Sequence, residues 1–163
     1  MKKFWFKKKS SLHGSGLFAS TNIKKGEKVI EYIGDKVSKK EGDKRAEKQI
    51  KKAQKNKSNG MVYVFELNKK YDIDGGVARN YARFINHSCN PNCEVEITNN
   101  HIWISSVKRI KKDDELLYNY GYPFDSDFED HICKCGSKKC VGYILSDDDW
   151  PKLKKALNKK NKF

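Results

Sequence analysis

The sequence predicts a mostly-β domain with irregular connections and one modest helix. Short apolar or alternating segments recur between polar turns, as in residues 61–67 and 71–74. The clearest helical periodicity lies in a single segment rich in Lys, Glu and Gln. A length of 163 residues fits one domain with a sizeable core, and eight Tyr, eight Phe and three Trp predict that this core is rich in aromatic side chains.

The first half of the chain is expected to hold a glycine turn, a strand and the helix. Gly14 and Gly16 flank one residue, so the backbone can turn sharply there and approach a ligand closely. Residues 28–34 have the pattern of a short strand. A helix is expected over Lys40 to Lys55, with a thin apolar stripe formed by Ala46, Ile50 and Ala53.

The second half is expected to consist of short strands, one helical turn and one hairpin. The strands are expected at residues 61–67, 71–74, 94–98, 101–107 and 116–118. Residues 78–84 fit a single helical turn. Asn99 and Asn100 stand between two strands and predict a tight hairpin turn.

The composition is strongly basic. The chain has 35 Lys plus Arg against 21 Asp plus Glu, a formal net charge of +14 and a sequence pI near 9.5. This charge favours an anionic partner such as nucleic acid, although a solvated Lys-rich surface explains it equally well. No apolar run approaches the ~20 residues of a membrane span, and residues 1–9 lack the apolar stretch of a secretion signal. We therefore expect an intracellular protein.

The five cysteines indicate a metal site. An odd number of closely spaced cysteines argues against a secreted disulfide framework and for metal ligation in a reducing compartment. Cys133, Cys135 and Cys140 supply three thiolates, whereas structural zinc takes four ligands in a tetrahedron. The fourth ligand must come from elsewhere in the chain, and the spacing leaves both Cys89 and Cys93 open.

The densest group of polar side chains lies at residues 86–93, directly after Phe84 and Ile85. It combines an amide, an imidazole and two thiols, which are costly in a core unless each has a partner. This density indicates a functional site. Some thirty residues later, Tyr118 and Tyr120 have the i, i+2 spacing that places side chains on one face of a strand, although an aromatic stripe in a core has the same spacing.

Three segments in this order resemble the core of the SET-domain protein-lysine methyltransferases with a C-terminal post-SET segment: Arg83 to Cys93, Glu115 to Gly121, and Cys133 to Cys140. The resemblance implies the SET β fold with its C-terminal pseudoknot. It also implies a domain order, with a SET domain at 8–123, a variable helical insert at 36–60, a post-SET zinc segment at 130–146 and a basic tail at 147–163. For the tail, a short docking helix and a frayed end fit equally well.

The resemblance implies two bound groups. S-adenosylmethionine (SAM) is the expected methyl donor, and its expected ligands are Gly14, Ser15, Gly16, Tyr32, Arg83, Asn86, His87, Tyr120 and Tyr143. One structural zinc ion is expected on Cys89, Cys133, Cys135 and Cys140. The expected catalytic residues are Tyr120, Tyr118 and Tyr63. Asn119 departs from the Asp that relatives usually have between the two tyrosines.

The function implied is SAM-dependent N-methylation of a protein lysine, with a histone tail as the first expected substrate. Tyr118 predicts mainly mono- or di-methylation, because its hydroxyl would retain a water where a larger, methylated amine needs space. Contact with nucleosomal DNA through the basic surface and a nuclear or chromosomal location are expected. The alternative is a non-catalytic, zinc-stapled SET module that binds chromatin or nucleic acid. The intact Tyr120, Asn86 and His87 favour the enzyme.

Overall fold

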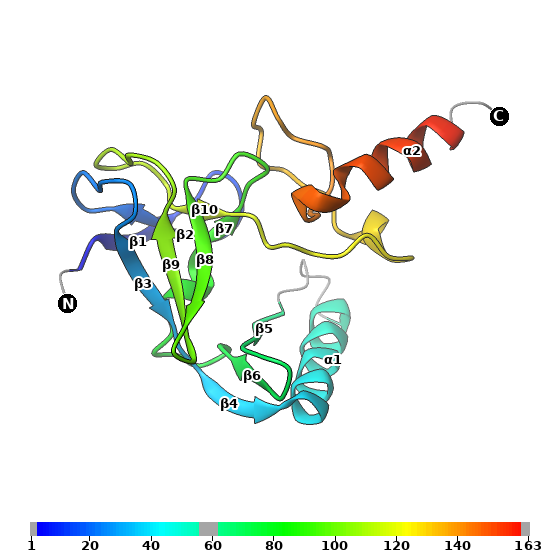
Figure 1. The fold of residues 1–163 in the computed structure, drawn as a ribbon, viewed down its shortest axis with the longest axis horizontal. Coiled ribbons are helices and arrows are strands. Elements are labelled where there is room, and N and C mark those ends of the chain that lie inside the picture. Colours follow the sequence, from blue (N-terminus) through cyan, green and yellow to red (C-terminus); the bar gives the residue numbers. More distant parts are fainter. Residues whose placement is uncertain (1–2, 56–61, 161–163) are drawn as a thin grey trace. The chain divides into compact units, whose positions relative to one another are not determined.

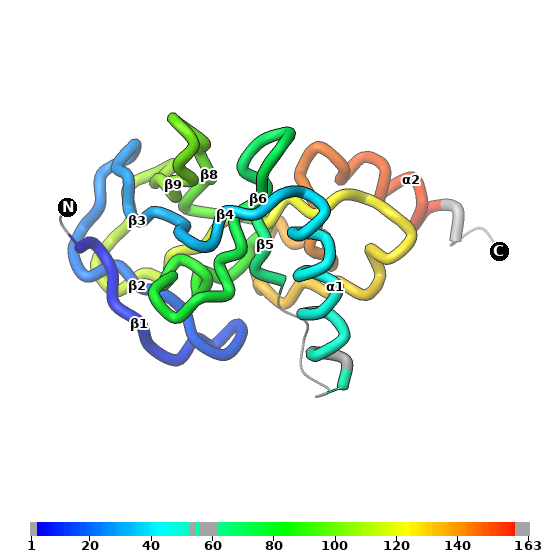
Figure 2. Tube along the Cα trace, turned by 90° about the horizontal axis from the view of Figure 1, so that it is seen from below, coloured from blue at the N-terminus to red at the C-terminus, as the bar shows by residue number. Residues whose placement is uncertain are grey.

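A computed structural model describes residues 3–55 and 62–160 of the chain (Figure 1). These residues divide into two compact units, each assembled from segments that are far apart in the sequence, as the colours along the tube in Figure 2 show. The first unit consists mainly of residues 28–84 and 95–105, and the second of residues 4–27, 85–94 and 106–163. No helix in the described part of the chain is long and apolar enough to cross a membrane.

Two three-stranded sheets form the framework of the first unit. One has the order β3 (Lys28–Tyr32), β9 (His101–Ser106), β8 (Cys93–Thr98), and the other the order β4 (Asp35–Ser38), β6 (Tyr71–Asp74), β5 (Val64–Glu66). Asn99 and Asn100 have φ values of 52° and 60° and form the predicted turn between β8 and β9. The strand expected over 61–67 is shorter, and Met61 lies outside the described residues. The single helical turn expected over 78–84 is the 3₁₀ helix η1 (Ala82–Phe84).

The long helix α1 (Lys39–Lys55) is held to the β4-β6-β5 sheet mainly by polar contacts. Lys39 Nζ lies 2.6 Å from Asp72 Oδ1, and Arg45 Nη1 lies 3.0 Å from Asp74 Oδ2. Both aspartates are buried. The predicted apolar stripe is wrong at Ile50, which is 42% exposed, because buried ion pairs replace apolar packing under this helix. The side chain of Ala53 and the expected end of the insert at 56–60 lie outside the described residues.

The second unit begins with an antiparallel hairpin of β1 (Trp5–Lys9) and β2 (Ser15–Ala19), which the sequence did not predict. Three lysines end β1, and such a basic segment carries little of the alternation that marks a strand. In the same unit β7 (Asn86–His87) pairs in parallel with β10 (Leu117–Tyr118). This short pairing places the central polar motif beside the tyrosine run.

The C-terminal segment folds around a small apolar cluster. It contains the 3₁₀ helices η2 (Phe128–Asp130) and η3 (Asp147–Asp149) and the helix α2 (Trp150–Lys160). Leu153 of α2 is 2% exposed and packs in the cluster that contains Phe128 and Leu145. Asp149 accepts a hydrogen bond from the Phe124 backbone N–H at 3.0 Å. Of the two alternatives for the tail, the described residues therefore adopt the docking helix.

Truncating Leu153 is expected to loosen this helix. Leu153→Ala should lower the free energy of unfolding by about 2–5 kcal/mol, because a buried leucine loses its apolar contacts and leaves a cavity. Denaturant unfolding measures the change, with Lys154→Ala as a control at an exposed position of the same helix. Equal stability of the two variants would show that α2 is not docked in solution.

Candidate active site and metal centre

Asn86 connects three segments of the second unit. Its Nδ2 donates to Glu115 Oε1 at 2.7 Å and lies 3.3 Å and 3.4 Å from the carbonyl oxygens of Ser15 and His13. The other carboxylate oxygen of Glu115 accepts from the Ser10 hydroxyl at 3.0 Å. The Asn86 side chain is buried, so this network fixes both its position and the orientation of its amide.

Glycine occurs at positions 14 and 16 of the Gly-x-Gly motif for different structural reasons. Gly14 has a φ of +50°, and a Cβ added there would meet nothing within 4 Å, so the backbone borders open space. Gly16 lies in β2, where an added Cβ would collide with the Glu115 carboxylate. Gly16 is thus required by packing against Glu115, whereas the space beside Gly14 is open.

His87 is neutral and has a defined tautomer. Burial lowers the pKa of His87 to about 4. Its Nδ1 accepts a hydrogen bond from the Tyr120 backbone N–H at 3.2 Å, so the proton of the neutral ring must be on Nε2. Nε2 lies 3.6 Å from Cys89 Sγ. The imidazole therefore lies between the tyrosine run and the first cysteine.

Tyr118 and Tyr120 are in ring contact, with centroids 5.0 Å apart, and Tyr118 is buried. The Tyr120 hydroxyl donates to the Ile85 carbonyl at 3.0 Å, and its ring meets the His87 ring edge-on at 5.3 Å. These contacts fix the Tyr120 hydroxyl at the C-terminal end of β10. Asn119 Oδ1 accepts from the Gly121 backbone N–H at 3.0 Å, a local contact that a carboxylate would also make.

Three other predicted site residues come together in the first unit. The Tyr32 hydroxyl donates to the Tyr63 carbonyl at 2.8 Å, and the Arg83 guanidinium lies over the Tyr63 ring at 5.6 Å from its centroid. Burial raises the pKa of the Tyr63 phenol, and the charge of Arg83 opposes this shift only partly. Tyr63 therefore stays protonated at neutral pH.

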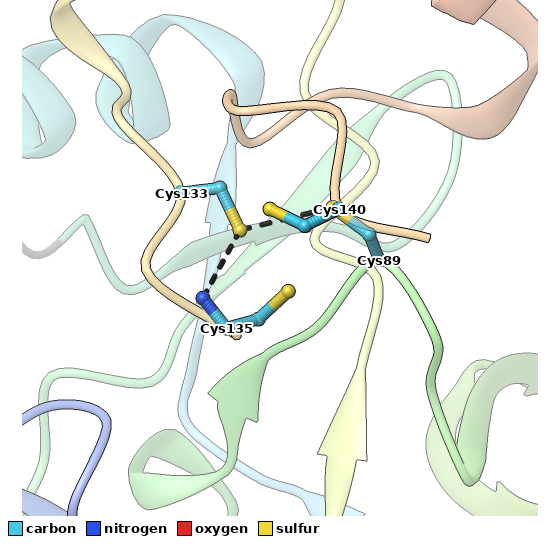
Figure 3. A group of neighbouring side chains, drawn as sticks. All are labelled: Cys89, Cys133, Cys135 and Cys140. Carbon is cyan, nitrogen blue, oxygen red and sulfur yellow. Dashed lines mark hydrogen bonds between the residues drawn. The ribbon is translucent and has the colours of Figure 1, made fainter. Parts of the chain in front are cut away.

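Four cysteines converge in the second unit (Figure 3). The sulfur atoms of Cys89, Cys133, Cys135 and Cys140 all lie within 4.8 Å of one another. The Cys89 and Cys133 sulfurs are 3.7 Å apart. Cys93 is buried, but it is not one of the converging cysteines. The arrangement selects Cys89 from the two alternatives that the spacing left open.

The charges of these thiols favour a bound cation. Burial raises the pKa of Cys89 to about 11 and also raises that of Cys133. For Cys135, burial is outweighed by hydrogen bonds, chiefly from Ser137, which lower its pKa to about 6. At neutral pH the group therefore carries a thiolate at Cys135, and its four soft sulfur donors suit a tetrahedral metal ion.

Glu115 and Tyr143 make contacts that the sequence did not indicate. Glu115 holds Asn86 and Ser10 through its two carboxylate oxygens, a role that only the folded arrangement reveals. The Tyr143 ring packs edge-on against Phe128 in the C-terminal cluster, with centroids 5.1 Å apart. The Tyr143 carbonyl lies 3.9 Å from Cys89 Sγ. The Tyr143 backbone therefore lies next to the cysteine group, and its ring belongs to the C-terminal cluster.

Three features together define the class of protein. They are a small β domain with a helical insert, a buried Asn-His pair beside two tyrosines, and a C-terminal loop that brings three cysteines to a fourth. Residues 14–121, more than half of the chain, match the SET domain. The chain belongs to the SET-domain family, and the fold expected from the sequence is confirmed.

Several proteins are similar to this chain. A putative histone-lysine N-methyltransferase 1 of Plasmodium falciparum is 40% identical over 140 residues, and histone-lysine N-methyltransferase 2B of Homo sapiens is 38% identical over 140 residues. An H3 lysine-4 specific histone-lysine N-methyltransferase of Emericella nidulans is 36% identical over 141 residues. Each match covers 83% of this chain but only 2%, 5% and 11%, respectively, of the relative.

A solved structure is also similar. The crystal structure of an active polycomb repressive complex 2 in the stimulated state contains a chain that matches with a TM-score of 0.64 and 32% sequence identity. The match covers 77% of this chain and 16% of that chain. The likeness therefore concerns one domain of a larger protein.

Proposed function

We propose that this SET domain is a SAM-dependent protein-lysine N-methyltransferase that acts on a histone. The observation that carries the proposal is the fixed Tyr120 hydroxyl beside the buried Asn86-His87 pair, in a chain of this family. The matched regions of its relatives lie in proteins named histone-lysine N-methyltransferases, which supports the histone as substrate. The alternative of a non-catalytic binding module has no comparable support.

The residues of the second unit suit SAM. The open space beside Gly14, the carbonyl oxygens of His13 and Ser15, and the Asn86 amide offer groups for the amino-acid part of that molecule. SAM, when bound, supplies an electrophilic methyl group. Ser15, Gly16, His87, Tyr120 and Tyr143 complete the proposed binding residues of this unit. The proposed ligands Tyr32 and Arg83 belong to the first unit.

The tyrosines would favour the neutral form of the lysine amine and orient it. A free lysine has a pKa of about 10.4, and an aromatic lining that removes water from the ammonium lowers that pKa and favours the neutral amine. The Tyr120 hydroxyl donates to the Ile85 carbonyl, which fixes the direction in which its oxygen would meet and orient the amine. We assign Tyr118 and Tyr63 as further tyrosines of the lysine-binding channel. No protein base is assigned, because His87 Nδ1 already accepts the Tyr120 N–H.

We propose that the four converging cysteines hold one structural zinc ion. Thiolates are the donors that zinc prefers, and their spacing of within 4.8 Å suits one tetrahedral ion. The ion would attach the 133–140 loop to Cys89, two residues after His87. It would thereby keep the C-terminal segment next to the proposed cofactor site.

Transfer of radiolabelled methyl groups tests the proposed function. The substrates are core histones, whole nucleosomes and bulk lysate proteins. Label on a histone that is lost in a Tyr120→Phe variant would support the proposal. Label confined to lysate proteins would exclude the histone as substrate. No label from any substrate, with SAM binding intact, would exclude the enzyme as it stands and favour the binding module.

The basic surface of α1 favours a contact with nucleosomal DNA and hence a nuclear or chromosomal location. Six exposed lysines of this helix recur at spacings that place them on one face: Lys40, Lys44, Lys48, Lys51, Lys52 and Lys55. If they contact DNA, then raising the salt concentration in the same assay should suppress methylation of nucleosomes more steeply than methylation of free histones. Equal suppression would exclude the contact.

Tyr118 is expected to limit the number of methyl groups transferred. Its hydroxyl would occupy, with a retained water, space that a di- or trimethylated amine requires. Tyr118→Phe should therefore shift the product from mono- and di-methyl lysine toward higher states, which mass spectrometry of a modified histone peptide would show. An unchanged product distribution at comparable turnover would contradict this role.

A further inference from the structure

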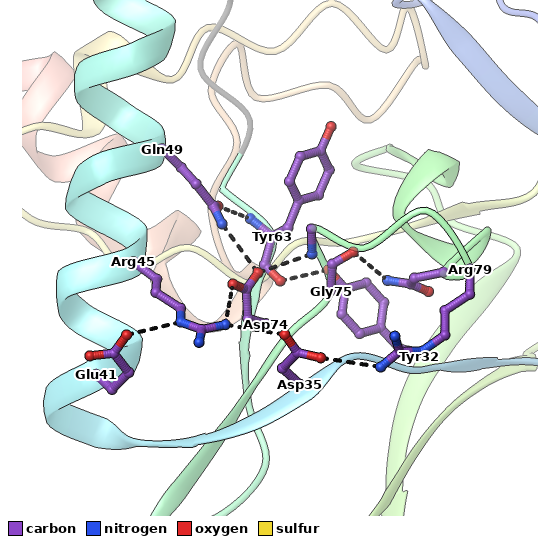
Figure 4. Close-up of polar contacts among 11 residues, drawn as sticks. Tyr32, Asp35, Glu41, Arg45, Gln49, Tyr63, Asp74, Gly75 and Arg79 are labelled. Atoms are coloured by element: carbon purple, nitrogen blue, oxygen red, sulfur yellow. Dashed lines mark hydrogen bonds and ion pairs between the residues drawn. The ribbon is translucent and has the colours of Figure 1, made fainter.

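The backbone of Tyr63 is bound at both of its polar groups (Figure 4). Its N–H donates to Gln49 Oε1 of helix α1 at 2.8 Å. Its carbonyl accepts from the Tyr32 hydroxyl and from the Gly75 backbone N–H, each at 2.8 Å. The only one of these three partners that comes from the helical insert is Gln49. A side chain of α1 thus fixes the backbone at the point where the chain rejoins the sheet before β5.

The amide of Gln49 is oriented by Asp74. Gln49 Nε2 donates to Asp74 Oδ1 at 3.2 Å, and the same oxygen accepts from the Gly76 backbone N–H at 3.0 Å. A carboxylate only accepts, so the NH₂ group of Gln49 must face Asp74 and its oxygen must face Tyr63. The hydrogen-bond network therefore determines which way this amide points.

Asp74 is in turn fixed by the helix. Arg45 lies one turn before Gln49 and donates from Nη1 to Asp74 Oδ2 at 3.0 Å. Its Nε donates to Glu41 at 3.1 Å, and its Nη1 also lies 3.4 Å from Asp35. These hydrogen bonds, first that to Glu41, raise the pKa of Arg45 above its ordinary value, so Arg45 stays charged. A continuous polar network thus leads from α1 through Asp74 and Gln49 to Tyr63.

We propose that Gln49 is a positioning residue for Tyr63 and that it tunes how the enzyme holds its lysine substrate. This inference rests on the proposed function, in which Tyr63 contributes to the lysine channel. Gln49 is half-buried and carries no charge. Its two hydrogen bonds therefore orient the Tyr63 backbone relative to Asp74 without adding an ion pair. A residue that only docked α1 on the sheet would not need to contact the Tyr63 backbone.

The test compares Gln49→Leu with Glu47→Leu. The first keeps a side chain of similar size without either hydrogen bond, and the second is a matched control at an exposed position of α1. With a histone peptide as substrate, Gln49→Leu should lower kcat about tenfold, because small displacements of positioning groups cost rate. The Kd for SAM should stay within about twofold. The control should match wild type in both.

A second readout does not depend on activity. A 3-fluorotyrosine placed at position 63 reports the surroundings of that ring by ¹⁹F NMR, and its resonance should shift or broaden in Gln49→Leu but not in Glu47→Leu. An unchanged resonance together with an unchanged kcat would overturn the proposal. A uniform loss of stability and of SAM binding would also overturn it, because that pattern marks a purely structural residue. If wild-type protein transfers no methyl group, the proposed function fails, and the NMR result alone decides whether Gln49 positions Tyr63.

Discussion

Replacing Tyr120 with Phe is expected to reduce methyl transfer by about 10²-fold or more. Folding and SAM binding should stay close to those of wild type, because the variant keeps the aromatic ring and the backbone of this proposed SAM ligand. The hydroxyl donates to the buried Ile85 carbonyl, so its oxygen has one fixed direction in which to meet a lysine amine. The ring would keep its contacts with Tyr118 and His87 in the variant. The loss should therefore appear in kcat, measured under saturating SAM.

Tyr122→Phe provides the control for this experiment. Tyr118, Tyr120 and Tyr122 form an aromatic row of contacting rings, and the Tyr122 ring centroid lies 5.9 Å from that of Tyr120. Burial raises the pKa of the Tyr122 phenol. Its ring contacts His131 rather than His87. Loss of its hydroxyl should leave kcat close to wild type. Equal losses in both variants would mean that the aromatic row matters for packing and would remove Tyr120 from its proposed catalytic role.

Local signals predicted the parts of the fold that depend on neighbouring residues. The hairpin at Asn99 and Asn100 follows from turn chemistry, since both residues tolerate the positive φ that the turn requires. Strand β6 has the predicted bounds, and α1 begins within one residue of its expected start. The three cysteines of the C-terminal loop were recognisable because their ligand spacing is local.

Contacts between distant segments explain what the sequence did not predict. The β1–β2 hairpin is stabilised by the buried Leu17 and Ala19 of β2, whereas β1 itself is basic and largely exposed. Glu115 begins one of the three segments recognised in the sequence, but only the fold places it against Asn86, 29 positions away. Gln49 resembled one more polar residue of a solvated helix. Polar side chains acquire such roles from their partners, which spacing along the chain does not identify.

The docking of α1 is the largest departure from hydrophobic patterning. A helix with a thin apolar stripe is marginal by itself, because most helical stability comes from packing. Here Asp72 and Asp74 are buried under the helix and neutralised by Lys39 and Arg45. Gly42 completes the fit, since an added Cβ would collide with the Asp72 carboxylate. The spacing of apolar residues predicted the helix, and the buried ion pairs determine where it docks on the sheet.

Loss of the proposed zinc ion is expected to have the largest effect on structure. Structural zinc contributes on the order of 10 kcal/mol to the folding of small zinc-binding peptides, and three of the four proposed ligands lie within residues 133–140. Cys133→Ser should reduce bound zinc from one ion per chain to less than a tenth of that. Because zinc binds thiolates and the pKa of Cys89 is raised to about 11, the apparent zinc affinity should increase with pH.

Metal analysis of purified protein, with SAM binding measured on the same samples, tests this prediction. Cys93→Ala is the matched control, because Cys93 is also buried but is not among the converging sulfurs. The control should keep one zinc ion, whereas Cys133→Ser should lose both the ion and most of its SAM affinity, since the 133–140 loop would no longer be attached beside His87. Full zinc content in Cys133→Ser would exclude the proposed ligand set. Zinc loss with unchanged SAM affinity would mean that the C-terminal cluster around Leu153 holds the segment without the metal.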